Sequence, residues 1–370
     1  MLDFHGIIFA YRANPALGDL VAHRTAASLP FCGRYRLIDL TLSSMINAGI
    51  RDVGVIMQRD YQSLLDHVGS GKPWDLDRKS GGLRILPPFG LPEYHKGNYA
   101  GTMEALNAVG EYIRDIPQKY VVLMLGDLCA NINLVPLMEE HIRSGNPVTA
   151  ICTDHLPDGL HHRYVVGEDG LVKEILFDRS SDGEGIASLE GYIINKDTLL
   201  AMMDACLARN EYRFHKDGLA NYLAQGGKMG VVVHHGYAKV IRSAETFFKA
   251  NMDMLDKDIF DGFFMADHPI RTKEHEGVST FYGNDARVYN SLLADNSIID
   301  GELENCVVFS GVRVGKGAKL KNCILMKGTE VGEDCQLSNI VADKNVHFAP
   351  RTVLIGADTL PTIVAKGKHI

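Results

Sequence analysis

The sequence predicts an α/β protein in two parts, a mixed sheet covered by helices and then a left-handed parallel β-helix. The chain has 370 residues, too many for one typical core. Its first two-thirds alternate apolar, strand-like runs with helix-like runs, which is typical of a mostly parallel sheet covered by helices. Its last part repeats at a fixed interval, which is typical of a solenoid. We therefore expect a first domain over 1–256, a linker over 257–285 and a β-helix domain over 286–370.

Composition narrows the classes of function. A hydrophobic content of 46% with 23% charged residues is that of a globular protein in water. The net charge of −8 argues against nucleic acid or an anionic membrane as a partner. No apolar run approaches about 18 residues, and the N-terminus lacks the features of a signal peptide. The seven cysteines have scattered spacing and no C-x-x-C, which favours a reducing cytoplasm over a disulfide framework.

The elements of the first part follow from its apolar periodicity. We expect strands and helices in alternation, then an antiparallel excursion of three strands, then further helices. The polar, glycine-bearing segment 70–82 is expected to be a surface loop. The expected strands lie at 5–9, 53–57, 120–125, 148–152, 164–166, 172–177 and 187–194, and the expected helices at 36–47, 61–68, 101–114, 196–209 and 243–255.

The repeat near the C-terminus predicts the β-helix. Similar segments begin at Leu303, Leu320 and Leu337, 17 residues apart, and apolar residues recur within them at intervals of about six. Three faces of about six residues make one triangular coil, and stacked coils share a continuous core. We therefore expect Cys306 and Cys323 to stack one coil apart as reduced thiols. Two alternatives are an antiparallel sandwich with coincidental spacing and an acyltransferase, for which His347 is the one histidine in the repeat.

One stretch carries a family resemblance. Residues 30–39, PFCGRYRLID, are followed by Ser43, Asn47 and Gly49-Ile50. This resembles the sugar-nucleotide pyrophosphorylases, most closely the glucose-1-phosphate adenylyltransferases (ADP-glucose pyrophosphorylases) of glycogen and starch synthesis. The resemblance covers essentially the whole chain and implies a Rossmann-like, GT-A-like nucleotidyltransferase domain followed by the β-helix.

The phosphate loop of that family is not kept here. Its AGGRGTRL falls on residues 10–17, so Tyr11, Arg12 and Ala16 occupy the loop, and the lysine of its RAKPA becomes Ala26. Loop glycines cradle phosphates because they reach positive φ and let backbone N–H groups approach the anion. Lysine and arginine stabilise the charge that develops during transfer. The resemblance therefore implies a retained frame and a degenerate catalytic loop.

The metal site also looks incomplete. The GD(H) motif of the family, whose aspartate holds Mg²⁺, is matched by Gly126-Asp127 with Leu128 after it. The second carboxylate of the family falls on Val240. A lone Asp127, the one surviving metal candidate, would hold Mg²⁺ poorly. We therefore expect no cofactor in this chain, with Mg²⁺ held by a partner catalytic subunit.

The sugar-phosphate side is altered in the same way. Glu190 falls on a glycine that leaves room for the sugar in the family, and a carboxylate there would repel a phosphorylated ligand. Arg179 loosely matches the lysine of FxEKP, and Gly101-Thr102 match the start of GTADA. Lys216-Asp217 resemble the end of FGxDI. The candidate residual ligand contacts are Gly101, Thr102, Asp127, Arg179 and Glu190.

These losses resemble the non-catalytic, D-type subunits that accompany an active adenylyltransferase subunit in glycogen-making bacteria. The resemblance implies a cytoplasmic regulatory subunit of a homo- or hetero-tetramer. Arg24 matches the arginine of RAKPA and is a candidate contact for a phosphate or sugar-phosphate effector, or else a surface arginine paired with Asp19 or Asp39. Whether the chain is an enzyme stays open. One alternative is an active sugar-phosphate nucleotidyltransferase that uses Arg12, Arg179 and Asp127, and another is a stand-alone sugar-nucleotide-binding sensor.

Overall fold

The structure is a computed structural model that describes residues 3–11, 14–58, 60–87, 99–155, 161–180, 183–274, 276–358 and 360–370. Its contacts divide the chain into two compact units. Unit 1 contains 1–12, 38–240 and 265–271, and unit 2 contains 13–37, 241–264 and 272–370. We expected a single boundary at residue 256 that divides the chain in sequence order. The contacts instead assign two segments before this residue to unit 2. No helix among the described residues is long and apolar enough to cross a membrane.

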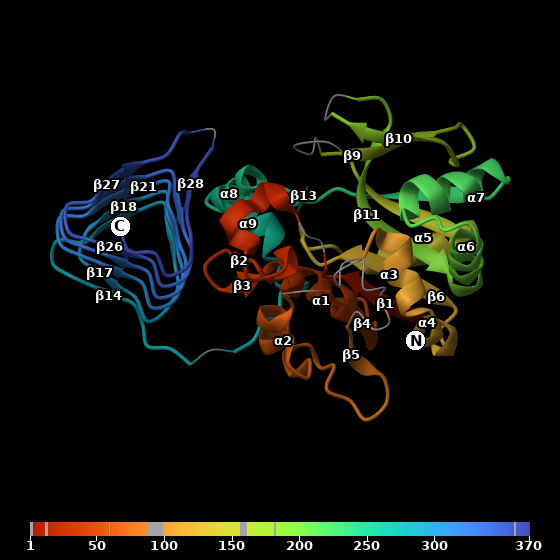
Figure 1. The fold of residues 1–370 in the computed structure, drawn as a ribbon, viewed down its shortest axis with the longest axis horizontal. Coiled ribbons are helices and arrows are strands. Elements are labelled where there is room, and N and C mark those ends of the chain that lie inside the picture. The colour runs from red at the N-terminus through yellow and green to blue at the C-terminus, as the bar shows by residue number, and fades with distance from the viewer. Residues whose placement is uncertain are drawn as a thin grey trace. The chain divides into compact units, whose positions relative to one another are not determined.

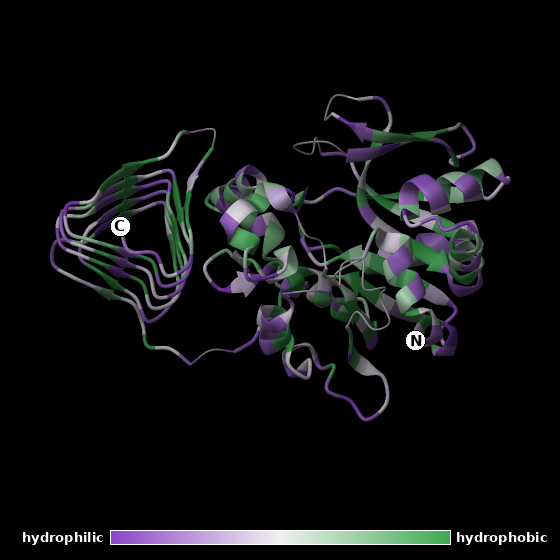
Figure 2. Ribbon diagram, viewed as in Figure 1, coloured by the Kyte–Doolittle hydropathy of each residue, from purple (hydrophilic) through white to green (hydrophobic). Residues whose placement is uncertain are grey.

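Unit 1 is built on a nine-stranded mixed sheet, which confirms the predicted fold class. Four strands pair in parallel in the order β6 (Tyr120–Leu125), β1 (Phe4–Phe9), β4 (Asp52–Ile56) and β5 (Gly82–Leu86). All six residues of β1 are buried, because helices cover both faces of a parallel sheet and leave no polar side. In contrast to β1, helices such as α7 (Ala220–Ala224) carry both polar and apolar residues, as Figure 2 shows.

The predicted antiparallel excursion is present. Strand β11 (Ile186–Asn195) runs antiparallel to β6 and to β8 (Val148–Thr153), and its first residues pair with β9 (His161–Val166). Strand β10 (Val172–Arg179) completes a hairpin with β9, and β12 (Met229–His234) extends the sheet beyond β8. The register of β11 shifts between Ser188 and Gly191, so a β-bulge lies where the strand changes partners.

The helices of unit 1 match the periodic segments, with one division. The expected helix at 101–114 is two helices, because the geometry breaks at Val109. Helix α5, which was not expected, has Asn133 as its N-cap, whose side chain accepts a hydrogen bond from the Val135 N–H. The helices are α1 (Leu37–Asn47), α2 (Gln62–Val68), α3 (Thr102–Ala108), α4 (Gly110–Asp115), α5 (Leu134–Ser144), α6 (Lys196–Ala208) and α7.

The expectation of a surface loop at 70–82 is wrong in its centre. A short 3-10 helix, η3 (Lys72–Trp74), places the indole of Trp74 in the core, where its exposed fraction is 0%. The ring of Trp74 lies edge-on to His67, which contacts the Asp39 carboxylate at 2.6 Å. Polar residues on both sides concealed this apolar anchor in the sequence.

Unit 2 contains the β-helix, whose three faces are three five-stranded parallel sheets (Figure 1). Each coil contributes one strand to each face. Leu303, Leu320 and Leu337 lie in register and are at most 2% exposed, so the 17-residue repeat places one leucine per coil in the core. The faces are β14 (Phe281–Tyr282), β17 (Ile298–Ile299), β20 (Arg313–Val314), β23 (Glu330–Val331) and β26 (His347–Phe348); β15 (Arg287–Tyr289), β18 (Glu302–Glu304), β21 (Lys319–Lys321), β24 (Gln336–Ser338) and β27 (Val353–Ile355); and β16 (Leu292–Leu293), β19 (Val307–Val308), β22 (Ile324–Leu325), β25 (Ile340–Ala342) and β28 (Thr362–Val364).

An asparagine ladder turns one corner of the first four coils. Asn290, Asn305, Asn322 and Asn339 all have positive φ, a conformation that asparagine tolerates better than most residues. Each side-chain amide donates to the next in the stack, with distances of 2.8, 3.3 and 3.0 Å. The corner residues therefore satisfy one another. All seven cysteines, including the stacked Cys306 and Cys323, are free thiols.

Unit 2 also contains the segments around the family motif. The hairpin β2 (Pro30–Phe31) and β3 (Tyr35–Arg36) follows the 3-10 helices η1 (Pro15–Val21) and η2 (Ala26–Ser28). Helix α8 (Ala244–Asp253) has a capping box made by Ser243 and Thr246. The stretch 257–285, expected as a linker, contains α9 (Lys257–Phe263), whose N-cap is Asp256, and the first strand of the β-helix.

Candidate functional site

Tyr11 occupies the place where the resembled family has the first glycine of its phosphate loop. It follows β1, at the carboxyl edge of the parallel strands, where open α/β sheets bind ligands. Tyr11 is 7% exposed, and its ring packs edge-on against Phe9 at 6.0 Å and against Tyr99 at 5.1 Å between centroids. Burial raises the pKa of Tyr99 well above its ordinary value. This corner of the sheet is therefore an aromatic cluster in place of a glycine loop.

The other loop positions do not restore a phosphate site. Arg12 lies outside the described residues. Ala16 is exposed in the 3-10 helix η1, which begins at Pro15, a residue without an N–H. Ala26, at the position of the family lysine, is fully buried in η2. None of the described loop positions offers a cation to a nucleotide phosphate.

Asp127 and Val240 are brought together, as the alignment to the family requires. Asp127 follows β6, and Leu128 opens β7 (Leu128–Ala130). Strand β13 (Ala238–Val240) runs antiparallel to β7, and Val240 lies directly opposite Leu128. The position of the second metal carboxylate therefore lies beside the first, and its side chain is an isopropyl group that is 3% exposed.

This arrangement does not fit Mg²⁺. The ion prefers octahedral oxygen ligands and is usually held by one or two carboxylates plus substrate phosphates. Here Asp127 is 1% exposed, and its partner position supplies no oxygen. No group of three or more histidine, cysteine or acidic side chains suited to a metal occurs in the described part of the chain.

Glu190, at the position of a family glycine, has a backbone conformation typical of glycine but carries a carboxylate side chain. It lies in the β-bulge of β11 with φ of +55° and an exposed fraction of 3%. Its N–H donates to the Ser188 hydroxyl at 2.9 Å. Positive φ is the conformation that glycine adopts freely and other residues adopt at a cost. The local backbone thus has the glycine geometry, while a carboxylate fills the space.

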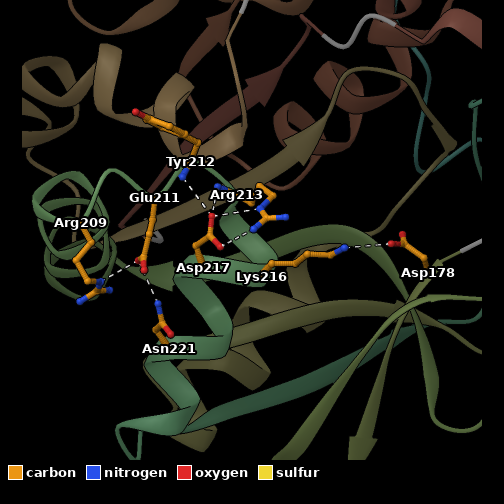
Figure 3. Close-up of polar contacts among 8 residues, drawn as sticks. All are labelled: Asp178, Arg209, Glu211, Tyr212, Arg213, Lys216, Asp217 and Asn221. Carbon is orange, nitrogen blue, oxygen red and sulfur yellow. Dashed lines mark hydrogen bonds and ion pairs between the residues drawn. The ribbon is translucent and has the colours of Figure 1, made fainter.

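The two motifs matched to the sugar-phosphate side meet in space. Figure 3 shows Lys216, in the π-helical segment η5 (Phe214–Leu219), reaching toward Asp178 of β10, with an N–O distance of 3.4 Å. The Lys216 ammonium also lies 5.4 Å from the ring centroid of Phe177. Arg179, the last residue of β10, is exposed. A sugar phosphate at this place would compete with Asp178 for Lys216.

Asp217 and Gly101 have structural roles beside it. The Asp217 carboxylate accepts hydrogen bonds from the Tyr212 and Arg213 N–H groups at 3.2 and 2.8 Å, as drawn in Figure 3. The Tyr212 carbonyl accepts the Met103 N–H at the start of α3. A Cβ on Gly101 would lie 2.1 Å from that carbonyl, so the glycine is required by close backbone packing. Thr102 is the first residue of α3.

Arg24 is buried in unit 2, so the expectation of a surface arginine is wrong. It is 6% exposed and forms an ion pair with Asp343, which is 1% exposed and lies in the β-helix. The ion-pair partner of Arg24 is therefore neither Asp19 nor Asp39. Asp39 contacts His67 in unit 1. One guanidinium nitrogen, Nη1, is buried and makes no hydrogen bond with any described residue.

Further cations surround this pair. Lys344 is half-buried, its N–H donates to Asp343 Oδ1 at 2.7 Å, and its ammonium forms no ion pair with a described residue. Burial, and then the charges of Arg36 and Arg24, lower the pKa of Lys344 to about 8. Lys366 contributes in the same direction. Burial is the largest cause, but three neighbouring cations add to it and only Asp343 opposes it, so the site has an excess of positive charge that an anion would relieve.

We name Arg24, Arg36, Lys344 and Lys366 the cationic cluster. Only Arg24 was identified as a candidate from the sequence, and the other three were missed. Asp343 is 319 residues from Arg24, and no sequence pattern links them. Lys344 repeats the position of Lys327 one coil earlier, which marked it as an ordinary coil residue. Tyr99 was missed because it lies far from Tyr11 in the chain.

Two family models match this chain. The model described as nucleotidyl transferase matches residues 17–238. The model described as GlmU-like, C-terminal hexapeptide matches residues 278–361. These matches cover the mixed sheet and the β-helix coils, respectively.

Curated relatives extend the match to nearly the whole chain. The glycogen biosynthesis protein GlgD of Bacillus subtilis is 33% identical over 362 residues, 98% of this chain and 95% of the relative. The protein of the same name from Geobacillus stearothermophilus is 34% identical, over 85% of this chain and 81% of its own length. A glucose-1-phosphate adenylyltransferase of Clostridium botulinum is 32% identical, over 84% and 81%.

Proposed function

Because this chain belongs to the nucleotidyl transferase family that includes the glycogen biosynthesis protein GlgD and the glucose-1-phosphate adenylyltransferases, we propose that it is a regulatory, catalytically inactive subunit of ADP-glucose pyrophosphorylase. It assembles with a catalytic adenylyltransferase subunit, in a tetramer of the cytoplasm, and raises the activity of that subunit or changes its response to effectors. Mg²⁺ and both substrates belong to the catalytic partner.

The observation that carries this proposal is the pairing of Val240 with Leu128 beside Asp127. The position for a second metal carboxylate is kept in place and filled by an aliphatic side chain. Tyr11 and Tyr99 fill the corner where the phosphate loop would lie. Removal of a single preorganised charge from an active site costs about 10²–10³ in rate, so losses at the loop, the lysine and the metal leave no useful turnover.

An activity assay tests the catalytic half of the proposal. The purified chain is incubated with glucose-1-phosphate, ATP and Mg²⁺, and an ordinary enzyme would turn over at about 10 s⁻¹. We expect no ADP-glucose above background. Any trace is checked with Asp127→Asn, since turnover by this chain would fall in the variant and turnover by a contaminant would not. Activity near the ordinary range that Asp127→Asn abolishes would establish an active nucleotidyltransferase instead.

Co-purification tests the regulatory half. The chain is co-expressed with a glucose-1-phosphate adenylyltransferase of the same genome, and the mixture is compared with each chain alone. We expect one complex whose activity or effector response differs from that of the catalytic chain alone. Separate elution combined with tight binding of a sugar nucleotide by this chain would favour the stand-alone sensor.

We further propose that the cationic cluster is the effector site of this subunit and takes a phosphate or sugar phosphate. Arg24 supplies a buried guanidinium, and Lys344 an ammonium that forms no ion pair with a described residue. Phosphate oxygens match an arginine fork, and a second cation beside it makes the contact charge-assisted. The alternative is a purely structural role, in which Arg24 only neutralises Asp343.

A further inference from the structure

One face of the β-helix combines ordered charge with exposed apolar side chains. It consists of β15, β18, β21, β24 and β27 and is called the ladder face here. The labels β18, β21 and β27 lie together on one side of the triangular coils in Figure 1. A groove of about 450 Å³ lies on this face. The whole face belongs to unit 2.

The outward residues of the ladder face change character from coil to coil. Each strand presents its first and third residue outward. The middle residue packs in or against the core in the second to fifth coils, whereas Val288 in the first coil is 38% exposed. From the first coil to the fifth, the outward pairs are Arg287 and Tyr289, Glu302 and Glu304, Lys319 and Lys321, Gln336 and Ser338, and Val353 and Ile355. The second coil is therefore wholly acidic and the third wholly basic.

These charges are paired within the chain but remain open to solvent. Lys321 lies 2.9 Å from Glu304, and Lys319 lies 3.7 Å from Glu302. The four side chains are between 44% and 65% exposed. Ion pairs this exposed contribute little to folding, so their ordered arrangement is available to a second molecule. Tyr289 and Ile355, at the two ends of the face, are 71% and 69% exposed.

We propose that the ladder face binds the ladder face of a second copy of this chain, about a two-fold axis that runs parallel to the strands between the second and third coils. The axis reverses the order of the coils and keeps positions along the strands. Glu302 of one copy then faces Lys319 of the other, and the reverse contact is identical. The same holds for the column of Glu304 and Lys321. Such an interface is isologous, so each pair occurs twice.

Other symmetric arrangements of the face are unfavourable. An axis along the stack would place Glu302 against Glu304 and Lys319 against Lys321, which opposes like charges. An axis through the third coil would place lysine against lysine. In the favoured arrangement Arg287 faces Gln336, and Tyr289 faces Ser338 with Ile355 one coil away, about 4.8 Å. The number of opposite-charge contacts is therefore greatest in this one register and direction.

The proposal does not rest on the regulatory function, because it concerns association of this chain with itself. The face is only five strands tall, about 24 Å at 4.8 Å per coil, so the interface lies at the small end of specific contacts. We expect a reversible dimer in the purified full-length chain at about 0.05 M salt. It should weaken at about 1 M salt, where the Debye length falls to about 3 Å.

The test uses two variants with opposite charge. Glu302→Lys/Glu304→Lys makes the second and third coils both basic, and Lys319→Glu/Lys321→Glu makes both acidic. Each variant alone opposes like charges, so we expect its dimer to be weakened about tenfold or more in sedimentation velocity. Mixed in equal amounts, the two variants restore every opposite-charge contact and should form a heterodimer. Circular dichroism and thermal unfolding of each variant confirm that the coils are intact.

A matched control lies on another face. Arg313 and Glu330 are neighbours in register on the face of β20 and β23. Arg313→Glu creates a like-charge pair in that ladder without touching the ladder face, and we expect it to dimerise like wild type. The proposal is overturned if wild type stays monomeric at about 0.05 M salt, if the charge variants associate normally or if their mixture does not associate. It is also overturned if wild type alone is monomeric and the ladder variants lose binding to a catalytic adenylyltransferase, because the occupant is then that partner.

Discussion

The guanidinium of Arg24 donates a hydrogen bond to the carboxylate of Asp343, and both side chains are buried. The pair joins the segment before the β2–β3 hairpin to the fourth coil of the β-helix within unit 2. Its removal from water is costly, and its mutual attraction offsets that cost only while both partners are present. Loss of either charge alone leaves the other buried and uncompensated.

A double-mutant cycle on this pair measures the coupling. We expect Arg24→Leu to lower the free energy of unfolding of unit 2 by about 3–5 kcal/mol, because Asp343 stays buried without its partner. Arg24→Leu combined with Asp343→Asn should recover a large part of that loss. Urea denaturation of the four proteins gives the coupling energy. Additive effects of the two substitutions would show that the pair is not coupled, and the stability of unit 2 would then depend on other contacts.

The buried position of Arg24 makes it a poor probe for an effector site, because its loss also destabilises the fold. Lys344 is the better probe, since its ammonium forms no ion pair with a described residue. We expect Lys344→Gln to keep the wild-type unfolding temperature or raise it, because it removes a charge held beside Arg24 and Arg36. The same variant should bind sulfate about tenfold more weakly, which is roughly 1.4 kcal/mol.

The pH dependence of that binding follows from the lowered pKa of Lys344. The folded value of about 8 lies below the ordinary value of 10.5, so the folded chain binds fewer protons than the unfolded chain between these pH values. The burial of the charged ammonium, with the repulsion added to it, therefore costs stability fully below about pH 8, and the cost disappears as pH rises toward 10.5. A bound anion raises the pKa of Lys344, so its binding takes up a proton above pH 8.

Sulfate is a suitable ligand for this measurement, because its charge does not change in the range studied. We expect its affinity to fall as pH rises from about 7.5 to about 9.5, and calorimetry near pH 8.5 in buffers of different ionisation enthalpy should show proton uptake. Lys344→Gln should bind sulfate with no such pH dependence. An unchanged affinity in that variant would leave Arg24 as a partner of Asp343 only and would assign effector binding to the catalytic chain.

The architecture could be predicted from the sequence because it depends on periodicity. The 17-residue repeat and the buried strand runs each reflect a regular local requirement, and both are present as expected. The losses at Tyr11 and Val240 were also visible, since each is a substitution within a motif. Trp74 and helix α9 were missed because one apolar residue in a polar stretch, or a seven-residue helix, gives a weak periodic signal.

The contacts that define the candidate sites were less accessible to sequence reasoning. The pairing of Arg24 with Asp343 and of Tyr11 with Tyr99 depends on how distant segments fold together. The positive φ of Glu190 was hidden for another reason, because a glutamate gives no sign that its backbone has the glycine conformation. A substitution at a motif glycine reports the loss of space and does not report whether the backbone moved.

Glu190 provides a direct test of whether that backbone is an inherited constraint. Its φ of +55° lies in a β-bulge whose neighbours are buried strand residues, so the chain cannot relax there without shifting the register of β11. A side chain with a Cβ costs roughly 1–2 kcal/mol in this conformation, and glycine escapes that cost. We therefore expect the free energy of unfolding of Glu190→Gly to exceed that of Glu190→Ala by about 1 kcal/mol.

The comparison with alanine is the control, because both variants remove the carboxylate and its contacts equally. In an ordinary strand alanine is the more stable of the two by about 0.5–1 kcal/mol, so the sign of the difference decides the question. Urea denaturation measures both, and an alanine variant at least as stable as the glycine variant would mean that the bulge relaxes and that the glycine geometry is not retained.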